Sequence, residues 1–261
     1  MDTIPRVPGR RIAFLVLLLA FGIAVQSAAA AGKTVDRCEI KPKTSCPRIL
    51  IHNENLSGED LTDANIPGAI ILGSKLEGTH FDGATIEKAE IRRSNFDKAI
   101  LDRASLSESN LTSVDANEAR FPNAELSRDF LRDVRMKKAD FSEAHMFDIS
   151  ISESHFEEAD FTGAELVGAV VNFDSRFEQA RFSKANLSGA ILARSAFVGA
   201  DFTGADLSDT IIVRSQFTGA DLGGANLSGA SVLNEAATFR FAKLCHTRMP
   251  DGSVSDRDCP R

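Results

Sequence analysis

The stretch Phe161-Thr162-Gly163-Ala164-Glu165-Leu166 contains the unit that decides the fold of this 261-residue chain. The segment Ala200-Asp201-Phe202-Thr203-Gly204-Ala205-Asp206-Leu207-Ser208 repeats it almost letter for letter. In both, a large apolar residue occurs at every fifth position, and a small residue precedes it by two positions. The pattern continues from Leu56 to Val232 in about 36 units, far more than the three that establish a repeat.

A period of five fits neither the 3.6-residue period of a helix nor the two-residue period of a strand, so each unit must form one side of a larger coil. When the chain is wound at about 20 residues per turn, every central Phe falls on two of the four resulting sides. The other two sides hold aliphatic centres such as Ile66 and Ile86. The sequence therefore predicts a four-sided coil in which two aromatic and two aliphatic sides meet inside. The central phenylalanines are Phe81, Phe96, Phe121, Phe141, Phe156, Phe161, Phe177, Phe182, Phe197, Phe202 and Phe217.

The small residues also point inward, and about nine such coils stacked at ~4.8 Å form a rod about 43 Å long. Between Val171 and Phe177 the register gains one residue, which predicts a bulge at one corner. From Val114 to Val134 the small position is filled by larger residues, including Asp129, and one centre is only Ala116. We expect these coils to be distorted.

The units follow the pattern A-D/N-L/F-x-x, and with it the chain resembles the pentapeptide-repeat proteins over roughly residues 51–234. The resemblance implies an all-β fold, a right-handed quadrilateral β-helix. It also implies a function without fixed chemistry, because the known roles of the family are few and diverse. Some cytoplasmic members protect DNA gyrase by mimicking the size and charge of duplex DNA.

The first 31 residues have the layout of a secretory signal peptide. Arg6, Arg10 and Arg11 precede an apolar run from residue 12 to 25, and small residues follow up to Gly32. About 14 apolar residues fall short of the ~20 that a membrane-spanning helix needs, so we expect cleavage near Ala31 rather than an anchor. The predicted organisation is a signal peptide over 1–31, an N-terminal cap over 32–50, the solenoid over 51–234 and a C-terminal cap over 235–261. The mature protein is expected to be periplasmic or secreted, without a membrane span.

Cys38, Cys46, Cys245 and Cys259 are an even set of cysteines in a chain expected to be exported, so they should be oxidised. The predicted rod separates the first two from the last two by about 43 Å, whereas a disulfide needs Cα atoms within about 7 Å. The pairs Cys38–Cys46 and Cys245–Cys259 follow, and the same distance argues against a four-thiolate metal site. We interpret the pairs as staples on two caps that cover the open ends of the core.

The sequence provides no pattern for catalysis, and we expect no enzyme activity, cofactor, metal or small-molecule substrate. The five histidines have no metal-ligand spacing, and a filled rod offers no concave pocket. One column of carboxylates, which includes Asp60 and Asp160, could bind calcium, but an Asp before the central residue also bonds its own turn backbone. The formal net charge of −7, which becomes more negative without the leader, argues against nucleic acid as a partner.

One aliphatic side has apolar residues at outward positions, where polar residues are expected. Two interpretations remain open: β-branched residues favour strands, or a contiguous apolar patch marks an interface. On the second interpretation this side docks a protein partner or a second copy of the chain. The candidate residues are Ile70, Leu72, Phe130, Val170, Phe173, Ile191, Ile211 and Val213, with Arg194 and Arg214 at the margin.

The sequence thus predicts a non-enzymatic exported scaffold or protein-binding module. The alternative is a DNA-mimic binder of a type II topoisomerase, which applies if the protein is cytoplasmic.

Overall fold

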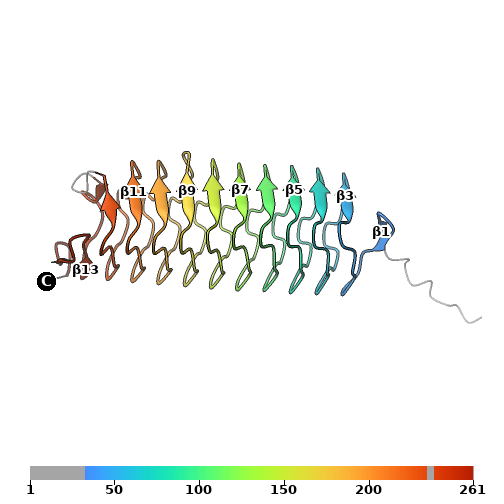
Figure 1. The fold of residues 1–261 in the computed structure, drawn as a ribbon, viewed down its shortest axis with the longest axis horizontal. Coiled ribbons are helices and arrows are strands. Elements are labelled where there is room, and N and C mark those ends of the chain that lie inside the picture. The colour runs from blue at the N-terminus through green and yellow to red at the C-terminus, as the bar shows by residue number, and fades with distance from the viewer. Residues whose placement is uncertain (1–32, 234–237, 261) are drawn as a thin grey trace, which may run out of the picture. The chain divides into compact units, whose positions relative to one another are not determined.

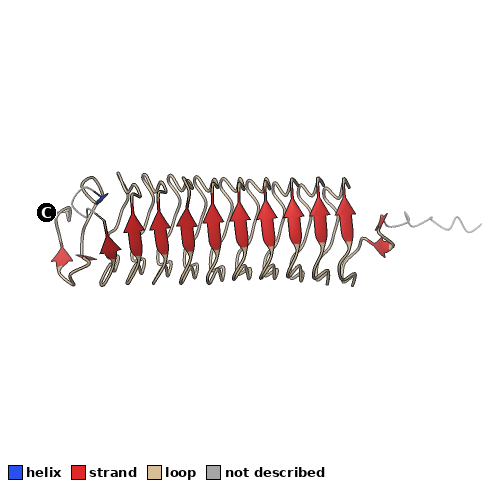
Figure 2. Ribbon diagram, turned by 45° about the horizontal axis from the view of Figure 1, so that its top comes forward, coloured by secondary structure: helices blue, strands red, loops and turns tan. Residues whose placement is uncertain are grey.

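The computed structural model describes residues 33–233 and 238–260, so the predicted signal peptide lies outside the described residues. A ten-stranded parallel sheet forms one side of the solenoid, and each strand pairs with the next one along the chain (Figure 1; Figure 2). Its strands are β3 (Leu50–His52), β4 (Ile70–Leu72), β5 (Glu90–Arg92), β6 (Asn110–Thr112), β7 (Phe130–Arg132), β8 (Ser150–Ser152), β9 (Val170–Asn172), β10 (Ile191–Ala193), β11 (Ile211–Val213) and β12 (Ser231–Val232).

The other three sides are held by single parallel bridges, each between residues 20 apart over most of the chain. Examples on three different sides are Ser45 with Asn65, Asn55 with Lys75 and Asp60 with His80. Together with the sheet these bridges make a parallel β-solenoid of four sides and about nine turns, which confirms the predicted fold class.

Each unit closes with a tight turn at a corner of the coil. The Ala64 N–H donates to the Leu61 carbonyl at 3.0 Å, and Asp63 between them has φ of 54°. A positive φ at the third turn position is the geometry of a type II turn, which glycine adopts without steric cost. Many corners nevertheless hold charged residues there, such as Lys98 and Glu118, both with φ of 57°.

Two columns of phenylalanine fill the C-terminal part of the core, as the 20-residue period predicts. In one column Phe156, Phe177, Phe197 and Phe217 stack with ring centroids 5.0–5.2 Å apart. A second column, from Phe121 to Phe202, has spacings of 4.8–5.0 Å, and its rings contact those of the first at 5.6–6.0 Å. Such offset aromatic contacts add to the free energy gained by burial.

The core of the N-terminal part lacks this continuity. Ala116 and Met136 occupy the places where the first column would continue between Phe96 and Phe156. A small apolar cavity of about 10 Å³ lies beside Ala116 and is lined by residues that include Phe96, Phe121 and Met136. The missing aromatic volume at Ala116 explains this cavity.

The predicted distortion between Val114 and Val134 is wrong. The strand pairing of β6 with β7 and of β7 with β8 keeps its 20-residue register, and so do the bridges Asp115–Arg135 and Glu125–His145. Val114, Asp129 and Val134 are therefore buried at the inward positions without a change in strand pairing.

The predicted bulge is confirmed between β9 and β10. Val171 pairs with Leu192, a step of 21 residues instead of 20. The extra residue is absorbed at the corner after β9, where Phe173 and Asp174 have φ of 50° and 60°. The buried Ser175 then restores the path of the chain by donating to the Asn172 carbonyl at 2.7 Å.

Short antiparallel pairs lie at the two ends of the solenoid. β1 (Thr34–Val35) pairs with β2 (Cys38–Glu39), and β13 (Thr247–Arg248) pairs with β14 (Val254–Ser255). Both predicted cysteine pairs lie at disulfide distance, with Cα atoms 6.1 Å apart for Cys38–Cys46 and 4.7 Å apart for Cys245–Cys259.

The hydrogen-bond ladder of the coils reaches into both predicted caps. The Lys43 N–H donates to the Thr62 carbonyl, and the Gly229 N–H donates to the Pro250 carbonyl. Among the described residues, no helix has the length and apolar character to cross a membrane.

Candidate interaction face

The ten-stranded sheet presents one flat side of the solenoid to solvent, and we call this side the strand face. In each strand the central residue points into the core, so the first and third residues point outward. The corner residue after each strand lies at the margin of the face. Because strands repeat at one register, side chains from successive coils form rows along it.

The strand face from β9 to β11 carries a row of aliphatic side chains, and the row ends at Ser231 on β12. We call the face from β9 to the residue after β12 the apolar half. Register pairs Val170 with Ile191 and Ile191 with Ile211, so the three lie side by side on adjacent strands. Val213 belongs to the second outward row, and Leu233 follows β12 with 58% of its surface exposed. Together these residues form an apolar surface in which Val170, Ile191 and Val213 are half-buried and Ile211 and Leu233 are exposed.

The corner inserted after β9 adds an aromatic ring to the margin of the apolar half. Phe173 is 52% exposed, and the Arg194 guanidinium carbon lies 5.9 Å from its ring centroid. Arg194 also lies 3.7 Å from an oxygen of Asp174. Arg214 follows β11 at the next corner and is exposed. Cationic side chains thus border the apolar surface on the side where the strands end.

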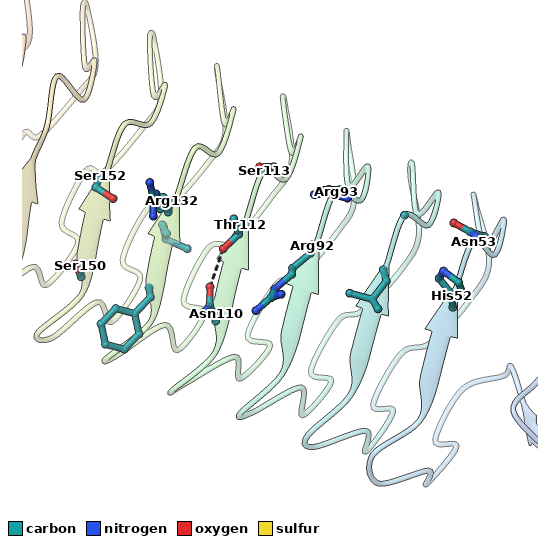
Figure 3. A pocket seen from close by; sticks show the side chains of 14 residues that line it. His52, Asn53, Arg92, Arg93, Asn110, Thr112, Ser113, Arg132, Ser150 and Ser152 are labelled. Carbon is teal, nitrogen blue, oxygen red and sulfur yellow. Dashed lines mark hydrogen bonds between the residues drawn. The ribbon is translucent and has the colours of Figure 1, made fainter.

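The strand face from β3 to β8 is different, because it is hollowed into a polar groove of about 810 Å³ that we call the arginine groove. Figure 3 shows Arg92, Thr112 and Arg132 in succession on neighbouring strands, with His52 and Asn53 two coils before Arg92. Small side chains form the hollow between longer ones. The lining residues are His52, Asn53, Leu72, Gly73, Arg92, Arg93, Asn110, Thr112, Ser113, Phe130, Leu131, Arg132, Ser150 and Ser152.

The structure brings together only part of the predicted apolar set. Val170, Phe173, Ile191, Ile211 and Val213, with Arg194 and Arg214, lie on β9–β11 and their corners. Ile70 and Leu72 lie on β4, beyond the polar residues of β5 and β6. Phe130, 59% exposed, stands alone on β7 within the arginine groove.

Sequence reasoning missed two exposed leucines and the groove itself. Leu233 lies 20 residues after Val213, and Leu50 lies 20 residues before Ile70. Extending the outward rows by one period in each direction would have found both. The groove had no such signal, because it depends on which outward side chains are short.

Asp129 is buried directly beside the groove residue Phe130. Its Oδ1 accepts a hydrogen bond from the Ser109 N–H at 2.7 Å, whereas its Oδ2 is buried without a partner among the described residues. Burial raises the pKa of Asp129 from 3.8 to about 9, an effect that the Ser109 N–H opposes and the charge of Glu125 reinforces. The carboxyl group is therefore protonated at neutral pH.

The column of carboxylates supports the solenoid turns. Asp60, Asp140 and Asp160 each accept a hydrogen bond from the backbone N–H two residues later, at 2.9–3.0 Å, and Asp201 and Asp221 do the same. Basic residues occur in the same column, and Arg181 lies between Asp160 and Asp201 with a nitrogen 3.3 Å from an oxygen of Asp160. In the described part of the chain, the one cluster with metal-ligand spacing is Cys245, His246 and Cys259, whose two sulfurs form a disulfide.

Comparison with solved structures finds chains that are similar to this one. Among solved structures, the chain is 24% identical to HetL, a pentapeptide repeat protein involved in heterocyst differentiation regulation in Nostoc sp. strain PCC 7120. That match covers 82% of this chain and 92% of HetL, with a TM-score of 0.45. This chain is also 22% identical to QnrB1, a plasmid-mediated fluoroquinolone resistance protein. That match covers 74% of this chain and 92% of QnrB1, with a TM-score of 0.42.

The search of curated proteins gave no match. The family description "Pentapeptide repeats" matches in eight copies over residues 89–128, 139–171, 173–209 and 210–249, which is more than half of the chain. Proteins of this kind are generally non-enzymatic structural or interaction proteins. The repeat, its period and its four-sided coil together place this chain in the pentapeptide-repeat family.

Proposed function

We propose that the protein is an exported, non-enzymatic scaffold that docks a partner protein on its apolar half. The observation that carries the proposal is the contiguous row of Val170, Ile191 and Ile211, extended by Val213 and Leu233. Large exposed apolar patches on soluble proteins usually mark interaction sites. A flat face with fixed rows is suited to a partner that buries its own apolar residues in register.

Strand propensity alone accounts for the β-branched residues but not for Phe173. This residue lies outside the strands, is 52% exposed and has φ of 50°, a backbone region that bulky residues rarely occupy. Leu233 is also exposed beyond the end of β12. Neither position gains from strand propensity, and both enlarge the apolar half, which favours a role in contact.

Export is supported by the layout of residues 1–31 and by the two cysteine pairs at disulfide distance. Disulfides persist in oxidising compartments and are rare in the cytosol. Intact mass of the protein from separated cell fractions, with and without thiol alkylation, tests this part. A periplasmic or secreted species that begins near Gly32 and has no free thiol is expected, whereas a full-length reduced species in the cytosol would overturn it.

The DNA-mimic alternative requires a surface of one sign, and the charge distribution does not favour it. Arg128, Arg135 and Lys137 each pair with an acidic residue on an adjacent coil. The partners are Glu108, Asp115 and Glu158, at 3.0–3.5 Å. Basic and acidic side chains therefore alternate along the rod, unlike the phosphates of duplex DNA.

The docking proposal is tested by photo-crosslinking from the apolar half, with and without a charge placed in it. A photo-crosslinking amino acid at position 211, introduced into cells that export the protein, should give one discrete adduct. The same residue at Lys75, on another side of the coil, should not. Adding Ile191→Glu to the variant with the crosslinker at position 211 should abolish the adduct. Sedimentation velocity of the adduct formed without Ile191→Glu shows whether it contains a second copy of the chain. Equal adducts at both positions, or none at 211, would overturn the proposal.

A further inference from the structure

We infer that the arginine groove is a second binding site, which takes an extended acidic peptide segment of a partner protein. The inference goes beyond the proposed function, because the groove lies on β3–β8 and shares no residue with the apolar half.

The charged side chains that line the groove are cationic, whereas the protein as a whole is acidic; two carboxylates beside the groove, Glu90 and Glu153, pair with Arg92 and Arg132. The lining includes Arg92, Arg93, Arg132 and His52 but no aspartate or glutamate. The whole chain has a formal net charge of −7. A cationic hollow on an acidic protein attracts anions locally, while the remaining surface repels those that do not fit it.

The arginines retain free hydrogen-bonding capacity. Arg92 contacts Glu90 at 2.6 Å and Arg132 contacts Glu153 at 3.3 Å, each as an exposed pair through one guanidinium nitrogen. Arg93 has no carboxylate within 4.0 Å among the described residues. A guanidinium carries five N–H donors in a fork that matches a carboxylate, so each arginine can bind a second carboxylate.

The spacing of the arginines fits an extended chain. Arg92 and Arg132 are two strands apart in one outward row, which corresponds to about 9.6 Å at the spacing of adjacent strands. In an extended polyproline II segment, residues i and i+3 project from the same side about 9.3 Å apart. Glutamates at every third position would therefore meet Arg92 and Arg132 together. Thr112 lies between the two arginines (Figure 3).

Apolar residues in the groove favour a peptide over a sulfated or carboxylated polysaccharide. Phe130 is 59% exposed and Leu72 is half-buried, and both line the hollow. An exposed aromatic ring can pack against proline or an aliphatic side chain. A charged sugar chain has less apolar surface for such a contact. The polar floor of Ser150 and Ser152 can bond peptide backbone groups.

The test uses a fluorescein-labelled peptide of about five Glu-Pro-Pro triplets and the full mature protein, with affinity read by fluorescence anisotropy. The groove variant combines Arg92→Ala, Arg93→Ala and Arg132→Ala. The matched control combines Arg120→Ala, Arg135→Ala and Arg181→Ala, which removes the same charge from exposed positions on other sides of the coil. Thermal unfolding of both variants verifies that the fold is retained.

We expect the groove variant to lose at least tenfold in affinity and the matched control less than threefold. Affinity for the peptide should fall with salt and should be absent for the Gln-Pro-Pro analogue. Equal losses of affinity in both variants would show that net charge alone causes the loss, and would overturn the inference. Tighter binding of a heparin oligosaccharide that depends on the same arginines would instead assign the groove to a polysaccharide. The double variant Ile191→Glu, Ile211→Glu should bind the peptide as the parent protein does, which would show that the apolar half does not contribute to peptide binding.

Discussion

The two halves of the strand face share one backbone and differ in everything that a partner would touch. From β3 to β8 the face is a hollow lined by arginines and hydroxyl groups, whereas from β9 to β11 it carries a row of valine and isoleucine. Both halves keep parallel pairing in register across the whole sheet. The coil thus assigns stability to inward residues and recognition to outward residues.

The halves also differ inside. Two columns of stacked phenylalanine fill the C-terminal part, whereas Ala116 leaves a cavity beneath the arginine groove. Four predictions test whether the inner and outer differences are independent, beginning with the largest expected effect.

The aromatic core should be the most sensitive part of the molecule. Phe177→Ala removes a ring that stacks on Phe156 and Phe197 at 5.0 and 5.1 Å. We expect the free energy of unfolding to fall by about 4 kcal/mol, the usual cost of a large-to-small change in a packed core. Chemical denaturation measures the loss, and hydrogen exchange should show it concentrated in the adjacent coils. A uniform loss of protection along the rod would contradict the expected nearest-neighbour behaviour.

Asp129 should make stability depend on pH. Its pKa of about 9 in the folded state exceeds its unfolded value near 3.8, so the folded protein binds more protons between those values and stability falls as pH rises through that window. The slope is about 1.4 kcal/mol per pH unit, or roughly 3 kcal/mol between pH 6 and 8. Asp129→Asn keeps an acceptor for the Ser109 N–H and should flatten this dependence, measured by urea unfolding at several pH values.

The matched variant Asp133→Asn controls for loss of an acidic group, since Asp133 is exposed and near the same strand. Its stability should follow the pH profile of the parent protein. A parental profile in Asp129→Asn as well would show that another group causes the dependence.

Filling the cavity should affect the two halves in opposite directions. Ala116→Val adds two methyl groups beside an existing void, and we expect a gain of about 1 kcal/mol. Ala180→Val adds the same groups at a fully buried position between Phe177 and Phe182 in the sequence, and should cost about 1–3 kcal/mol by overpacking. Thermal unfolding of both variants checks the signs, and a loss in both would show that the cavity cannot take the added methyl groups.

The smallest effect on stability should come from exchanging outward residues. Asn110→Ile and Ser150→Val would extend the apolar row of β9 into β6 and β8 without touching the core. We expect the unfolding free energy to change by no more than about 0.5 kcal/mol, as is usual for surface positions. Peptide binding by the groove is measured in parallel. A large change in stability would refute the separation of inner and outer roles.

The sequence predicted what depends on period. The four sides, the Phe columns and the 21-residue step after Val171 all follow from residues that must point inward at fixed intervals. The cysteine pairs at disulfide distance follow from the length of the rod. The expected distortion near Val114 was wrong, because the inward positions accept Val114, Asp129 and Val134 while the strands keep their register.

The candidate sites were harder to predict, because outward residues have no common periodic requirement. Leu233 and Leu50 could have been found by continuing the rows, whereas the groove depends on the shapes of Ser150, Thr112 and Arg92 relative to one another. The unpartnered oxygen of Asp129 depends on three-dimensional packing, although its inward position was visible in the repeat.

The 20-residue turn has a consequence for any partner that engages both halves. Each complete coil adds about 4.8 Å between them, so their separation takes only stepwise values. Inserting one whole turn between β8 and β9 would move the two sites apart by one step and leave the face of each unchanged. A bivalent partner of fixed span would therefore bind both sites at once for one number of intervening coils, and not for one coil more or one coil fewer.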